Sequence, residues 1–318
     1  MTSEAGDDVV IAAKLATHRR VSASPFGPDD QIGMMNILTD TTRGALLSRV
    51  SNGALYDLAV EFFVEMPGYY GANDPHFEIC MSHTPPGTRN EGGAQFGGDV
   101  AGYSGDIVSF YTHCGTHLDS LNHFGYGDQV WNGFSAADDL GSRHWLKNGP
   151  EHLPPVVTRG VLLDVAGALA TDVLPDSYGV GPEEIEKTLS TQGVSLEAGD
   201  AVLMRTGKMR HWPDQESFAS GYRFPGLNLE GARVLAEAGC VIVGTDAMSP
   251  EQSPSAISDH PAPVHSYLLS ECGVLIVENL WLEDLARDEV YEFGFFGAPI
   301  KFRGATGTPI RPFATRLS

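Results

Sequence analysis

Residues 228–244 read Asn-Leu-Glu-Gly-Ala-Arg-Val-Leu-Ala-Glu-Ala-Gly-Cys-Val-Ile-Val-Gly, and the fold class follows most directly from them. Asn228 is a typical N-cap and Gly239 a typical C-terminal stop, so the pattern predicts a helix over 228–238. The run 240–244 that follows is short and continuously apolar, as in a strand covered on both faces. A helix that leads directly into a buried strand is typical of an α/β fold.

The same alternation extends outward in both directions. We predict strands at 55–64, 159–166, 200–205 and 273–277, helices at 40–51, 182–192 and 265–270, and further strands in the tail at 290–315, broken at Gly304 and Gly307. Continuous apolar strands separated by helices favour a buried parallel or mixed sheet. The sequence therefore predicts an α/β fold with a mixed sheet.

Two stretches depart from this alternation. Residues 1–35 are polar and then rich in turn residues, which predicts an N-terminal extension, with a single domain over 36–318. Residues 66–105 are rich in Gly, Pro, Asn and His and show little periodicity. So long a stretch inside one domain is usually functional, so we expect a lid or an arm used in oligomer formation.

The composition excludes several classes of partner. The 318 residues carry a formal net charge of −21, which argues against nucleic acid and against an anionic membrane surface. No apolar run approaches the length of a membrane span, and the N-terminus lacks the pattern of a signal peptide. The four cysteines are scattered without a Cys-x-x-Cys pair, as expected for reduced thiols. We therefore expect a cytoplasmic protein.

Residues 113–123 concentrate groups that bind metals and transfer protons. They read His-Cys-Gly-Thr-His-Leu-Asp-Ser-Leu-Asn-His, so three histidines and one aspartate fall within eleven residues. Imidazole nitrogen and carboxylate oxygen together suit a divalent ion such as Zn²⁺ or Mn²⁺. The alternative is a set of surface or core histidines that only form hydrogen bonds. This alternative would be preferred for a single histidine.

The spacing within this cluster favours an extended segment over a helix. His113, His117, Asp119 and His123 share one parity, which places them on one side of a strand, whereas a helix would turn Asp119 away. The preceding residues 106–112 are rich in β-branched and aromatic side chains. We therefore place the cluster at the end of a strand that runs into a loop.

Other residues could serve the same site. His265 and Glu278 lie at corresponding ends of adjacent predicted elements, and an unpaired buried carboxylate would be costly, so both could meet the cluster. Asp246 follows the strand 240–244 and is either a site residue or a structural cap. Cys114 has the wrong parity for a ligand, and Arg205 with Thr206 could bind a carboxylate or form an ordinary salt bridge. Aromatic residues could wall a pocket or simply fill the core; these are Phe110, Tyr111, Trp131, Phe134, Phe224, Phe295 and Phe296.

The segment His113–His123 resembles the signature His-x-Gly-Thr-His-x-Asp, followed four residues later by His, of the metal-dependent cyclase family, which includes bacterial kynurenine formamidases and isatin hydrolases. The resemblance continues at 26–33, 200–207, 244–246, 265–280 and 304–307. Leu121 stands where smaller members usually have Pro. The resemblance implies a swivelling β/β/α fold, often dimeric or tetrameric.

By position, the resemblance implies that His113, His117 and Asp119 are the primary metal ligands and that His123 is the catalytic acid/base. His265 and Glu278 would complete a second metal site in members that bind two ions. The cofactor would be one or two divalent ions, Mn²⁺ or Zn²⁺.

The leading functional prediction is a metal-dependent hydrolase of a small amide, formamide, lactam or lactone. It would act on C–N bonds like an arylformamidase, and its substrate could be aromatic. A lyase or cyclase that works through an enolate would use the same residues. A non-catalytic metal-dependent binding protein would keep the ligands but would not need His123. We also expect a homodimer or homotetramer.

Overall fold

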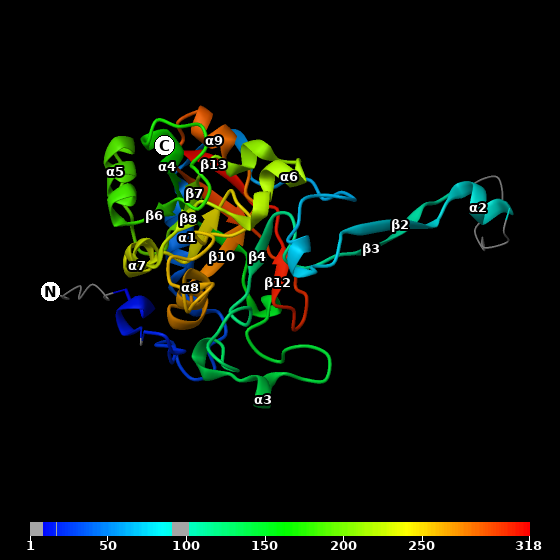
Figure 1. Cartoon of the computed structure of the whole chain (residues 1–318), viewed down its shortest axis with the longest axis horizontal. Coiled ribbons are helices and arrows are strands. Elements are labelled where there is room, and N and C mark those ends of the chain that lie inside the picture. The colour runs from blue at the N-terminus through cyan, green and yellow to red at the C-terminus, as the bar shows by residue number, and fades with distance from the viewer. Residues whose placement is uncertain (1–8, 17, 91–101) are drawn as a thin grey trace.

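A nine-stranded mixed sheet forms the centre of the molecule (Figure 1). The computed structural model describes residues 9–16, 18–90 and 102–318. The parts of our predictions that concern residues 1–8, 17 and 91–101 lie outside these described residues. In spatial order the strands are β1 (Val50–Asp57), β13 (Phe313–Leu317), β11 (Glu292–Gly297), β5 (Val156–Asp164), β7 (Ala201–Arg205), β9 (Ile242–Thr245), β10 (Leu275–Glu278), β4 (His117–Asp119) and β12 (Gly307–Pro309).

The strands β5, β7, β9 and β10 are parallel, and the strands on either side of them run antiparallel. The parallel strands are the continuous apolar runs of the sequence, and their residues are almost entirely buried. The predicted α/β fold with a mixed sheet is therefore confirmed. A small parallel pair, β6 (Gly179–Val180) and β8 (Gly226–Leu227), lies outside the main sheet.

Helices pack against the sheet and against one another. In chain order they are α1 (Asp40–Ser48), α2 (Pro85–Asn90), α3 (Ala136–Asp139), α4 (Val165–Ala168), α5 (Pro182–Gln192), α6 (Gln215–Phe218), α7 (Leu229–Glu237), α8 (Pro263–His265) and α9 (Glu283–Arg287), and a π-helical segment, η8 (Ser266–Glu271), continues α8. Helix α5 packs on β5 and α7, and α7 packs on α8 (Figure 1).

Local sequence signals mark several element ends correctly. Helix α5 spans the predicted residues 182–192, and the Oδ1 atom of Asn228 caps α7 by accepting a hydrogen bond from the Gly231 N–H. Helix α1 is shorter than predicted and is capped by Thr39. The strand predicted at 55–64 has the wrong bounds, because β1 spans Val50–Asp57. At the next residue the Leu58 N–H donates to the Pro312 carbonyl, and the Leu58 side chain is buried in the core.

The stretch 66–105 contains most of an antiparallel hairpin, formed by β2 (Glu78–His83) and β3 (Gly105–Ser109). The hairpin stands away from the body of the molecule, with α2 toward its far end (Figure 1). The side chains of Ile79, Met81, Ile107 and Val108 on its two strands are exposed. The low periodicity of this stretch thus corresponds to a projecting arm whose two strands are exposed almost throughout.

The described part of the N-terminal extension packs on the domain. Ala12, Ala13, Met34 and Met35 are buried in the main core, and the Met34 N–H donates to the carbonyl of Gly273. No helix within the described residues is long and apolar enough to cross a membrane.

Candidate metal centre

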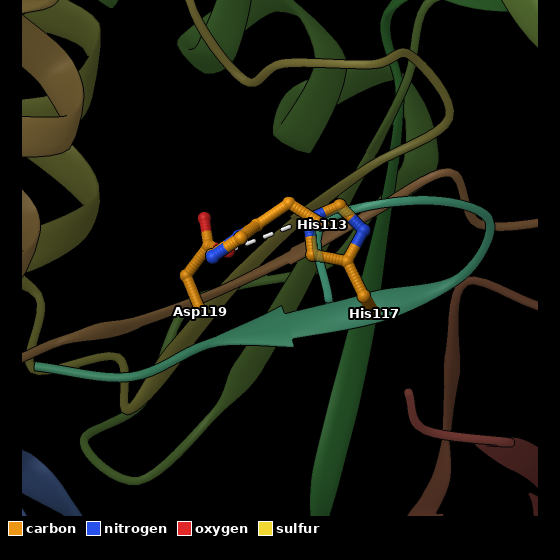
Figure 2. Close-up of side chains that lie close together, drawn as sticks. All are labelled: His113, His117 and Asp119. Atoms are coloured by element: carbon orange, nitrogen blue, oxygen red, sulfur yellow. Dashed lines mark hydrogen bonds and ion pairs between the residues drawn. The ribbon is translucent and has the colours of Figure 1, made fainter. Parts of the chain in front are cut away.

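Strand β4 places His117 and Asp119 on one face, because residues two apart in a strand point the same way. His113 reaches the same place from the preceding turn, and its Nδ1 atom lies 2.6 Å from Oδ1 of Asp119 (Figure 2). The prediction that alternate residues share one side of a strand is confirmed for His117 and Asp119. It is wrong for the segment from His113 to His123 as a whole, because only residues 117–119 form a strand. Gly115 adopts a φ of +56°, and a Cβ atom there would lie 2.7 Å from Phe62, so the chain turns between His113 and His117.

Hydrogen bonds orient the rings of two histidines. The Nδ1 atom of His117 lies 2.9 Å from the Gly115 carbonyl, which fixes the proton on Nδ1 and leaves the lone pair on Nε2. His113 lies between Asp119 and Thr306, whose Oγ1 atom is 2.9 Å from Nε2 of His113. These contacts hold both rings before any ligand binds.

His265 and Glu278 come to the same place from other elements. His265 ends α8, and Glu278 ends β10, the strand that pairs with β4. Glu278 lies between two histidines: its Oε2 atom is 3.3 Å from Nε2 of His117 and its Oε1 atom is 3.2 Å from Nε2 of His265. The structure thus brings His265 and Glu278 to His117 and Asp119, although the nearest of these residues in sequence, Asp119 and His265, are 146 positions apart.

His123 follows β4 and stacks on His113, with ring centroids 3.8 Å apart. Within the part of the chain that the structure describes, two groups of potential ligand atoms result, and in each group all atoms lie within 4.8 Å of one another. The first is His113, His117 and Asp119, and the second is Asp119, His123 and His265. Asp119 is common to both groups, so the arrangement has room for one ion or for two.

The site attracts positive charge. Burial lowers the pKa of His117, but Asp119 and Glu278 outweigh burial and raise this pKa to about 10. Burial likewise opposes a raised pKa at His265, where Glu251 and Glu278 raise it to about 10. Burial would raise the pKa of Asp119, yet the surrounding histidines hold it well below its ordinary value. Burial holds the pKa of His123 well below its ordinary value, so this ring favours the neutral form.

The donor set fits a divalent metal ion. Among the described residues, the Nε2 atom of His117 and the Oδ2 atom of Asp119 are buried without a hydrogen-bond partner. Buried polar atoms normally form hydrogen bonds. Two buried atoms without one, each with a lone pair and both in one cluster, are what a bound cation would require. Nitrogen and carboxylate ligands of this kind suit Zn²⁺ or Mn²⁺.

Glu251 is a site residue that sequence reasoning missed. Its Oε1 atom accepts a hydrogen bond from the backbone N–H of His265 over 2.7 Å and lies 3.1 Å from Nδ1 of the same residue. Glu251 thereby directs Nε2 of His265 toward Asp119 and Glu278. No spacing rule marked it, because it lies in an irregular loop. Asn279, also missed, donates from Nδ2 to the Gly115 carbonyl and supports the turn that carries His113.

Three other candidates serve the fold. Asp246 accepts hydrogen bonds from the Thr206 N–H, the Thr206 hydroxyl and the Gly207 N–H, which ties the ends of β7 and β9 together. Arg205 forms salt bridges with Asp164 and Glu283. Cys114 packs with Met66 and Phe77, and burial raises the pKa of its thiol to about 12, which favours the neutral thiol.

A cavity of about 310 Å³ opens beside the metal centre. Its apolar and aromatic walls come from Pro67, Tyr69, Tyr111, Phe124 and Met248. Of the aromatic residues singled out from the sequence, Tyr111 lines this cavity, whereas Trp131, Phe224 and Phe295 are fully buried in the core. Phe110 packs against Phe62, Phe77 and Phe302; Phe296 stacks on Phe313; and Phe134 lies under Lys147.

Comparison with known proteins gives a consistent picture. A family model described as a putative cyclase matches residues 56–252. A search of curated proteins found no match. Among solved structures, a novel cyclase is 26% identical and aligns over 95% of this chain and 100% of its own, with a TM-score of 0.83.

Two more distant structures share the fold. Isatin hydrolase A from Labrenzia aggregata, bound to benzyl benzoate, is 20% identical over 83% of this chain and 94% of its own, with a TM-score of 0.61. A predicted metal-dependent hydrolase from Bacillus stearothermophilus is 21% identical over 83% of this chain and 98% of its own, with a TM-score of 0.51.

Proposed function

The chain belongs to the putative cyclase family, and from this membership and the metal centre we propose that it is a metal-dependent hydrolase of a small amide, formamide, lactam or lactone. The observation that carries the proposal is a pair of buried atoms, Nε2 of His117 and Oδ2 of Asp119, that form no hydrogen bond with the described residues and lie beside a cavity with aromatic walls. The isatin hydrolase and metal-dependent hydrolase among the structural neighbours support the same class of reaction.

His113, His117 and Asp119 would hold one divalent ion, and His265 and Glu278 would complete a second position if two ions bind. A divalent ion in such a site polarises a carbonyl and makes water more acidic, which is the chemistry that hydrolysis needs. Glu251 keeps Nε2 of His265 directed into the centre. The Gly115 carbonyl does the same for His117, whereas Thr306 contacts Nε2 of His113, so that Nδ1 of His113 faces Asp119.

His123 is the proposed general acid/base. It lines the cavity, and its ring stacks on His113 and lies against Phe124, with ring centroids 3.8 Å and 4.7 Å apart. From this position its neutral ring would take a proton from the attacking water and pass it to the leaving nitrogen or oxygen.

The walls of the cavity fit a small, partly apolar substrate. Tyr69, Tyr111 and Phe124 offer ring faces, and a volume of about 310 Å³ lies at the small end of ligand pockets. A planar aromatic amide or lactam would stack on these rings while its carbonyl faces the metal centre. We therefore propose an aryl formamide or a fused lactam as the substrate class.

The test is a substrate screen with purified protein whose metal content has been measured. Aryl formamides, isatin-like lactams and small lactones would be assayed with the Zn²⁺-loaded and the Mn²⁺-loaded protein, and with protein stripped by a chelator. We expect turnover that depends on the metal. If no compound in these classes is turned over by either loaded form, the proposed function is wrong.

Solvent labelled with ¹⁸O then separates hydrolysis from elimination or ring closure. A hydrolase incorporates one solvent oxygen atom into the acid that it forms, whereas a lyase that works through an enolate incorporates none. Label in the product supports the proposal, and metal-dependent turnover without label would replace it with the lyase.

A further inference from the structure

Asp74 lies at the base of the hairpin arm and lines the cavity beside the candidate metal centre. It follows the short helix η3 (Tyr70–Ala72) and Asn73, which adopts the left-handed conformation with a φ of +67°. The preceding loop is anchored to the body: the Gly68 N–H bonds to Gln215, the Gly71 N–H bonds to the Tyr222 hydroxyl, and the ring of Tyr69 stacks on that of Tyr222. Asp74 is therefore held beside the cavity by a fixed loop.

The other two carboxylates that line the cavity, Glu251 and Glu278, contact histidines, whereas Asp74 forms no hydrogen bond or ion pair with a described residue. Glu251 and Glu278 both contact His265, and Glu278 also contacts His117. Asp74 also belongs to neither group of clustered metal ligands. Burial raises the pKa of Asp74, because part of its solvation is lost, and the nearby His113 offsets this effect only in part.

Asp74 borders the space that a substrate would fill. Neither Lys nor Arg occurs among the described residues that line the cavity. The segments 1–8, 17 and 91–101 contain neither residue in their sequence. The positive groups nearest to Asp74 are therefore the histidines of the candidate metal centre, and no lysine or arginine is available to pair with it in the cavity.

We infer that Asp74 selects the substrate, and that the substrate carries a protonated amine which this carboxylate binds while the carbonyl group faces the metal centre. The inference rests on the proposed function for the identity of the reacting group. An ammonium group would restore the lost solvation of Asp74 through a charge-assisted hydrogen bond. A substrate with a carboxylate at the same position would meet Asp74 without any Lys or Arg to offset the repulsion.

Binding tests this inference independently of turnover. Benzylamine, which is an ammonium ion at neutral pH, and benzyl alcohol, its neutral analogue, would be titrated calorimetrically into the metal-loaded protein. We expect benzylamine to bind about tenfold more tightly than benzyl alcohol, and Asp74→Asn to abolish the difference. Asp106→Asn removes the same charge from an exposed position on β3 outside the cavity and should leave the difference intact. A preference for benzylamine that survives Asp74→Asn would place the amine on the metal and overturn the inference.

Kinetics provides the second readout. Formanilide and its aminomethyl derivative would be compared in the wild type and in Asp74→Asn. We expect the variant to raise KM about tenfold for the aminomethyl compound alone, with kcat unchanged for both. Equal losses of kcat on both compounds would make Asp74 part of the chemistry and not a selector. If the wild type turns over neither compound, the proposed function fails on these substrates, and the calorimetric comparison still decides the role of Asp74.

Discussion

Glu251 contacts His265 twice, through the backbone N–H over 2.7 Å and through Nδ1 over 3.1 Å. The two residues are 14 positions apart, and His265 is the last residue of the short helix α8. A carboxylate that accepts the outer N–H of a histidine fixes which nitrogen faces the metal and makes that nitrogen more basic.

Glu251→Gln should therefore weaken metal binding about 10- to 100-fold, the usual effect of removing such a partner. Metal affinity would be measured by competition with a chelator. Glu186→Gln, an exposed change of the same kind on α5, serves as the control. Unchanged affinity in Glu251→Gln would show that His265 needs no orientation or does not ligate.

Asp119→Ala should empty the metal centre, because Asp119 belongs to both groups of clustered ligand atoms. Elemental mass spectrometry would compare the variant with the wild type and with Asp106→Ala, which removes an exposed carboxylate from β3. Equal metal content in all three proteins would contradict the assignment of Asp119.

His123→Ala should keep its metal and its fold while turnover falls by about 10² or more, the scale of general acid–base catalysis. The expectation comes from the stacking of His123 on His113 and its exposure to the cavity. Metal content and kcat would be measured on the same preparation. Loss of metal together with activity would make His123 a ligand, as its place in the second group allows.

Asp246 should make stability depend on pH. Burial raises its pKa to about 6, against hydrogen bonds from Thr206 and Gly207 that lower it. A carboxyl group whose pKa is higher in the folded state stabilises the fold when protonated, so its contribution is complete below about pH 4 and is lost as pH rises through about 6. The free energy of unfolding of the wild type, minus that of Asp246→Asn, should thus fall by up to about 3 kcal/mol over this range. Urea unfolding of both proteins between pH 4 and 7 measures it. A difference that stays constant would mean that the three donors keep Asp246 ionised.

The hairpin arm should be covered by a second copy of the chain. A two-stranded hairpin with apolar side chains on both faces is marginal in water, and Ile79 and Ile107 are 46% and 59% exposed. Ile79→Lys with Ile107→Lys should shift the protein toward monomer in analytical ultracentrifugation. Ile300→Lys, at an exposed position that is not part of the hairpin, is the control. A wild-type protein that sediments as a monomer would refute the proposed homodimer or homotetramer.

Local signals in the sequence were sufficient for most elements of the sheet and its helices. Asn228 and Gly239 delimit a helix because capping depends on a few neighbouring residues, and the run 240–244 reads as a buried strand because its covered faces demand apolar side chains. The His-x-Gly-Thr-His-x-Asp pattern likewise pointed to a metal ligand cluster, since His113, His117 and Asp119 lie within seven residues.

Only the tertiary structure decided how the cavity is completed. Strand pairing of β4 with β10 brings Glu278 to His117, and α8 brings His265 to Asp119, which depends on contacts between segments far apart in the chain. Glu251 and Asp74 had no local pattern to mark them, because each lies in an irregular loop whose position is set by the elements around it. The turn at Gly115 also overrode strand parity, since a left-handed residue redirects the chain. Periodicity and capping act over a few residues, whereas a site is assembled by packing across the whole fold.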